Sequence, residues 1–116
     1  MARVLRCLWA LALTLLLGCV SPTLPLPPPE TPLISAGSTP NRYLLSGGPG
    51  GAQPNAFVIA INSNSAVPRN LRVNGTQADE KGAWSVEVYA SPGQRIDITQ
   101  EIGNSRSPPL SILIPR

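Results

Sequence analysis

The stretch Trp84-Ser85-Val86-Glu87-Val88-Tyr89 decides the fold class of this chain. Apolar side chains at Trp84, Val86 and Val88 alternate with polar or amphipathic side chains at the positions between them. A period of two is typical of a β-strand that buries one face and exposes the other. We therefore predict a strand here, with Trp84 and Val86 facing the core.

Other short runs with β character lie on both sides of this strand, separated by turn-forming residues. The runs are 43–45, 56–61, 71–73, 96–99 and 110–114, and the turn signals lie at 46–51, 62–65, 79–82, 91–93 and 103–105. Asn74-Gly75 is a further hairpin-turn signal. Six or seven short strands at this spacing predict an all-β fold, a small antiparallel Ig-like β-sandwich.

The core of this sandwich is predicted from the apolar faces of the strands. Its expected members are Phe57, Ile59, Trp84, Val86, Ile96 and Ile98. In the nearly continuous apolar run 56–61, this prediction places Val58 and Ala60 on the outer face.

The order of these elements resembles bacterial Ig-like and carboxypeptidase-regulatory-like modules. The resemblance lies in Asp79-Glu80-Lys81-Gly82-Ala83-Trp84-Ser85-Val86, followed by Pro92-Gly93-Gln94-Arg95-Ile96, within about 46–114. It implies a seven-stranded sandwich that serves as a structural or binding module and has no catalytic residues.

The N-terminal 18 residues have the pattern of a signal peptide. Arg3 and Arg6 precede an apolar run at 8–17, which is too short to span a bilayer as a helix. The run ends in Leu16-Leu17-Gly18-Cys19, which resembles the lipobox of bacterial lipoproteins. The resemblance implies cleavage before Cys19, a thioether-linked diacylglycerol on its sulfur and acylation of the new amine. The alternative is ordinary secretion of a soluble product.

Lipid on Cys19 predicts a protein held at the membrane of the cell envelope, because two or more acyl chains anchor stably. No Asp follows Cys19, since Val20 and Ser21 come next. In the enterobacterial lipoproteins that this leader resembles, an Asp in second place favours retention in the inner membrane, so the resemblance implies the outer membrane rather than the inner one. Seven prolines at 22–40 then predict a disordered tether over 19–40, which reaches roughly 60 Å if fully extended. The sandwich domain is expected at 41–116.

Composition excludes several kinds of chemistry. The chain has no histidine, and its two cysteines are Cys7 and Cys19. Imidazole catalysis and His or Cys metal sites are therefore excluded from the exported part. The Gly-rich stretch 47–51 lacks the residues of a phosphate-binding loop, and Asp79-Glu80 fits a solvated turn better than a calcium site. We expect no enzyme activity, cofactor, metal or small-molecule substrate.

Charge does not predict a nucleic-acid partner. Without Arg3 and Arg6, seven basic residues face six acidic ones, and the basic residues are spread singly. Two functions remain. The first is a membrane-anchored lipoprotein whose non-catalytic sandwich is a structural, spacing or binding module. The alternative is an accessory, pilotin-like assembly subunit that binds an envelope partner protein by strand addition.

Overall fold

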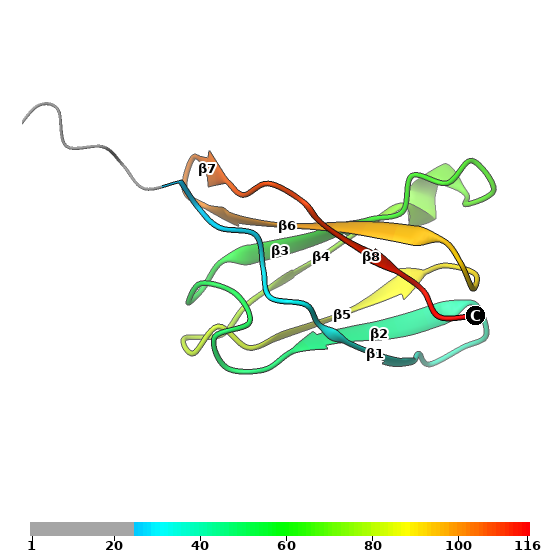
Figure 1. Ribbon diagram of the computed structural model, residues 1–116, viewed down its shortest axis with the longest axis horizontal. Helices are drawn as coiled ribbons and strands as arrows, with labels where there is room; N and C mark the ends of the chain where they lie inside the picture. The colour runs from blue at the N-terminus through cyan, green and yellow to red at the C-terminus, as the bar shows by residue number, and fades with distance from the viewer. Residues whose placement is uncertain (1–24) are drawn as a thin grey trace, which may run out of the picture.

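The computed structural model describes residues 25–116, which form two antiparallel sheets packed face to face (Figure 1). The strands are β1 (Leu33–Ala36), β2 (Arg42–Gly47), β3 (Phe57–Ile61), β4 (Val73–Gln77), β5 (Trp84–Tyr89), β6 (Arg95–Ile102), β7 (Ser105–Arg106) and β8 (Leu110–Leu113), with a 3-10 turn η1 (Arg69–Leu71) before β4. One sheet has the order β1-β2-β5. The other has the order β4-β3-β6-β7, with β8 also paired to β6. The predicted small β-sandwich is confirmed.

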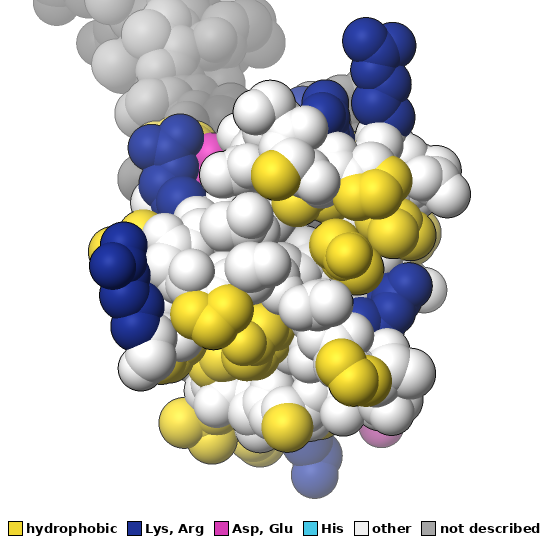
Figure 2. Space-filling model, turned by 90° about the vertical axis from the view of Figure 1, so that its right-hand side faces the viewer, with side chains coloured by type: hydrophobic (Ala, Val, Ile, Leu, Met, Phe, Trp, Pro, Cys, Tyr) yellow, Lys and Arg dark blue, Asp and Glu magenta, His cyan; other side chains and the backbone are white. Residues whose placement is uncertain are grey.

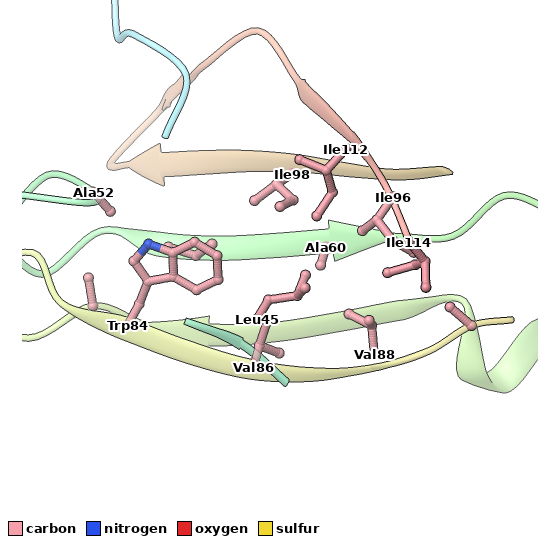
Figure 3. Packing of buried hydrophobic residues seen from close by; sticks show 13 residues of the cluster. Leu45, Ala52, Ala60, Trp84, Val86, Val88, Ile96, Ile98, Ile112 and Ile114 are labelled. Atoms are coloured by element: carbon pink, nitrogen blue, oxygen red, sulfur yellow. The ribbon is translucent and has the colours of Figure 1, made fainter. Parts of the chain in front are cut away.

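The core lies between the two sheets and is built from alternate residues of each strand (Figure 3). Leu45, Trp84, Val86 and Val88 come from the three-stranded sheet, and Val58, Ala60, Ile96, Ile98 and Ile112 come from the five-stranded sheet. Trp84, Val86, Ile96 and Ile98 are therefore buried as the alternation predicts. Their burial removes apolar surface from water, which is the main driving force for folding.

The prediction for β3 is wrong, because the strand presents its other face to the core. Val58 and Ala60 are fully buried, whereas Phe57 is 55% exposed and Ile59 is only partly buried. In the register of the sheet, Ala60 lies beside Ile98 of β6. The neighbouring strand thus fixes which face of β3 points inward. A run in which both faces are apolar carries no alternation from which that choice could be made.

The predicted tether over 19–40 is also wrong within its described part, and the domain does not begin at 41. β1 pairs with β2 along its whole length, from Leu33 opposite Ser46 to Ala36 opposite Tyr43. Pro29 and Pro32 are buried just before this strand. Prolines are tolerated there because an edge strand leaves some of its N–H groups unpaired. Residues 19–24 lie outside the described residues.

Three smaller expectations also differ from the structure. Asn74-Gly75 lies inside β4 rather than in a hairpin turn, and Leu71 belongs to η1 rather than to a strand. The strand count is eight, because β1 and the short β7 were not expected. The turn at 79–82 is present as predicted and leads directly into Trp84.

Candidate functional site

The sandwich has two ends that differ in which segments they carry (Figure 1). The near end, where the described chain begins, carries the loop 48–56, the turn 78–83 and the β6–β7 hairpin. The far end carries the β1–β2 hairpin, the loop 62–72, the turn 90–94 and residue Arg116. Cys19, the predicted lipidation site, lies outside the described residues.

A buried glutamine fastens the N-terminal segment to the near end. Gln100 of β6 is 1% exposed, and its Nε2 donates to the carbonyl oxygen of Pro27 at 2.6 Å. Its Oε1 accepts from the backbone N–H of Gln53 at 2.7 Å. The backbone N–H of Glu30 also donates to the carbonyl oxygen of Gly51 at 2.9 Å. These bonds satisfy groups that would be costly to bury unpaired, so they hold residues 27–30 against the sandwich.

A second buried amide organises the far end. Asn62 is 2% exposed, and its Nδ2 donates to the Tyr89 carbonyl at 3.0 Å and to Gln94 Oε1 at 2.9 Å. This network fixes the loop after β3 against the turn before β6. Between these two segments lies an open polar hollow of about 330 Å³, lined by Ser63, Asn64, Gly93, Gln94 and Arg95.

Charged side chains are segregated between the two ends. The far end holds five arginines (Arg42, Arg69, Arg72, Arg95, Arg116) with Glu87 and Asp97. The near end holds Glu30, Asp79, Glu80 and Glu101 with Lys81 and Arg106. Figure 2 looks onto the far end and shows dark blue side chains around its rim, with little magenta. The expectation that basic residues are spread singly holds along the sequence and fails in space.

The arginines of the far end differ in how they are held. Arg72 donates through Nε to the Val67 carbonyl at 2.9 Å and thereby pins the loop 62–72. Arg95 Nε lies 3.5 Å from Asp97 Oδ1, and its side chain is 62% exposed. Arg69 is exposed and has no ion pair among the described residues. At least Arg69 and Arg95 are thus accessible to a partner.

The sheet face that was expected in the core is instead an apolar outer surface. Phe57 is 55% exposed and Val73 is 61% exposed, and Ile59 and Ile61 lie between them on the same side of β3 and β4. Gly75 lies opposite Ile59 and leaves a gap in the side-chain layer of this face. Within residues 25–116, β4 pairs with β3 alone, so no strand is hydrogen-bonded to its other edge, although β5 of the facing sheet lies close by.

The acidic turn has the hydrogen bonding of a structural turn. Asp79 Oδ1 accepts from the backbone N–H of Lys81 at 2.8 Å and of Ala83 at 3.0 Å. These bonds, the one from Ala83 foremost, lower the pKa of Asp79 below its ordinary value. Nowhere in residues 25–116 do three or more histidine, cysteine or acidic side chains gather to hold a metal ion. No helix of this part of the chain is long and apolar enough to cross a bilayer.

Comparison with known proteins found no matching family model, no similar curated protein and no similar solved structure. The candidate sites are therefore argued only from the sequence and structure of this chain.

Sequence reasoning missed the arginine-rich end, although a signal for it exists. Arg42, Arg72 and Arg95 stand at or just before the first residue of β2, β4 and β6. Strands that start at the same end of an antiparallel sandwich bring such residues together.

Proposed function

We propose that this protein is a bacterial lipoprotein of the cell envelope, anchored through lipid on Cys19, with outer-membrane placement favoured over the inner membrane. Its sandwich serves as a non-catalytic structural, spacing or binding module. The observation that carries the proposal is Leu16-Leu17-Gly18-Cys19 directly after a positively charged and then apolar leader. A cysteine at that place becomes the N-terminal, lipid-bearing residue of a mature lipoprotein.

The described fold agrees with such an anchor. Pro25 follows Cys19 by six positions, and an extended chain spans at most about 3.6 Å per residue. The folded unit would thus sit within roughly 20 Å of the lipid, rather than at the end of a long spacer. The near end of the sandwich would face the bilayer, because the Gln100 bonds hold the incoming chain there.

Metabolic labelling tests the anchor. Cells that express the full chain are fed an alkyne fatty acid, and the protein is purified and coupled to a fluorophore. Wild type and Cys7→Ser should label equally, since Cys7 lies within the leader. Cys19→Ser should not label. Equal labelling of Cys19→Ser would refute the proposal, whereas loss of label in Cys7→Ser would move the lipid to the other cysteine.

A second function, strand addition by an envelope partner protein, is favoured by the open edge of β4. The strand Val73-Asn74-Gly75-Thr76-Gln77 has no charge and no proline, the usual devices that block edge pairing. The apolar surface of Phe57 and Val73 adjoins this edge. Such a partner would hydrogen-bond the free backbone groups and cover those side chains.

The edge hypothesis is tested with a photo-crosslinking residue at Gln77, compared with one at Ser85 on the exposed face of β5. Strand addition predicts a discrete adduct in intact cells from position 77 alone, lost when Val73→Lys places a charge on the edge. Adducts of equal yield from both positions, or none from either, would contradict it.

A further inference from the structure

We infer that the arginine-rich far end docks an acidic glycopeptide polymer of the cell-wall kind, in which sugar hydroxyls and peptide amides lie beside free carboxylates. The inference rests on the proposed function for the placement of the molecule in the envelope. It goes beyond that function in naming the surface and the chemistry of its partner.

The first step is the charge of the far end. Five arginines meet there with only two acidic side chains, whereas the near end holds four acidic side chains and two basic ones. Opposite charge at the two ends gives the sandwich a dipole, which orients it toward an anionic surface with the far end leading. A partner with repeated negative charge is therefore complementary to this end and repelled by the other.

The second step is the chemistry of the hollow at that end. Ser63 offers a hydroxyl, Asn64 and Gln94 offer the NH2 groups of their carboxamides, and Arg95 stands at the edge of the hollow. The two carboxamide oxygens already accept hydrogen bonds within the protein, so these amides donate to sugar or peptide oxygens, whereas the hydroxyl can both donate and accept. The guanidinium of an arginine matches the two oxygens of a carboxylate with paired N–H donors. Together these groups fit a polymer that carries sugars, peptides and carboxylates.

The third step disfavours the phosphates of the anchoring membrane as the partner. The chain is fixed to the near end by the bonds between Gln100, Pro27 and Gln53. The eight-residue strand β6 alone is about 26 Å long, so about 20 Å of chain from Cys19 does not let the molecule stand inverted with its far end on the same bilayer. The arginines are instead presented away from that membrane, toward material in the space beyond it.

Two double variants with the same loss of charge test the assignment. Arg69→Gln with Arg95→Gln removes two cations from the far end, one exposed and one paired to Asp97. Lys81→Gln with Arg106→Gln removes two cations from the near end, one exposed and one paired to Glu101. Each variant thus loses one ion pair. A melting temperature equal to that of the wild type establishes that each variant remains folded.

The binding measurement is co-sedimentation of the detergent-solubilised full chain with purified cell-wall sacculi. Wild type and the near-end variant should bind alike, and the far-end variant should bind about tenfold more weakly. Sacculi whose carboxylates have been converted to amides should no longer bind the wild-type protein. Salt should weaken binding, since the Debye length falls from about 10 Å at 0.1 M to about 3 Å at 1 M.

Three outcomes would overturn the inference: equal binding by both variants, undiminished binding to amidated sacculi, or release of the protein from sacculi by mixed micelles of phosphatidylglycerol and the same detergent but not by neutral micelles. Because the assay is done in detergent solution, it does not depend on lipid. If the protein binds sacculi but Cys19 is not labelled, the lipid anchor is refuted and the polymer-binding inference stands. If Cys19 is labelled but the protein does not bind sacculi, the polymer-binding inference is refuted and the lipid anchor stands.

Discussion

At the scale of single residues, the packing around Trp84 shows how the sequence specifies this core. The indole is 5% exposed, and its Nε1 has no hydrogen-bond partner among the described residues. Gly47 is its cross-strand neighbour, and a side chain at Gly47 would overlap the indole ring. The strand β2 therefore ends in glycine because the large ring of β5 occupies the space across from it.

We predict that Gly47→Ala destabilises the protein by about 1–3 kcal/mol, since an added Cβ would lie 2.9 Å from the ring carbons Cδ1 and Cε2. The ring fills a packed core and has little room to move. Gly48→Ala is the matched control, because nothing lies within 4 Å of a Cβ at that position. Thermal unfolding checks both variants, and a loss in melting temperature shared by Gly48→Ala would contradict the steric explanation.

At the scale of elements, sequence patterns succeeded where polar residues mark one face. Ser85 and Glu87 interrupt the apolar residues of β5, so its inward face was evident. β3 has no such interruption, so its inward face could not be predicted. That face is set by the register that places Ala60 beside Ile98. Proline content suggested a tether, but Leu33–Ala36 pairs with a strand that follows it in sequence. The two strands form a hairpin across residues 37–41, in which Asn41 takes a positive φ, and the prolines on either side outweighed this local turn signal. The lipid site and the family resemblance remain predictions.

We predict that the segment 27–32 is released when Gln100, the buried side chain that fastens it, is replaced. Gln100→Ala leaves the Pro27 carbonyl and the Gln53 N–H without partners, which costs about 1–3 kcal/mol per group if they stay buried. Release of the segment avoids that cost by returning those groups to water. Limited proteolysis should give a resistant fragment that begins near residue 25 in wild type and beyond residue 32 in the variant.

The control for this substitution is Gln77→Ala, whose amide makes a single bond to the Asn55 carbonyl at 3.2 Å on the exposed edge strand β4. It should leave the resistant fragment unchanged. A wild-type fragment that begins near residue 41 would instead show that the N-terminal segment is not packed in solution.

At the scale of the whole molecule, the proposed lipid anchor and the charges of the two ends predict the same orientation relative to the bilayer. The incoming chain is fastened at the acidic near end, and the arginines gather at the opposite end (Figures 1 and 2). A lipid-anchored molecule with this arrangement stands with its basic end away from the bilayer. A long disordered tether would have allowed either end to reach an anionic membrane.

We predict that this orientation is measurable in reconstituted vesicles. The described residues contain no cysteine, so a fluorophore can be placed at Asn104→Cys in the β6–β7 hairpin or at Ser63→Cys in the far-end loop. Quencher lipids in the bilayer should dim the dye at 104 strongly and the dye at 63 weakly, because six residues of chain keep the near end within roughly 20 Å of the lipid.

Twelve Gly/Ser residues inserted after Ser21 should lengthen the tether and let the arginine-rich end reach bilayers that contain phosphatidylglycerol. Quenching at 63 should then rise in those bilayers and not in neutral ones. Equal quenching at the two positions before the insertion would show that the molecule tumbles freely about its anchor, and the directed presentation of the far end would be wrong.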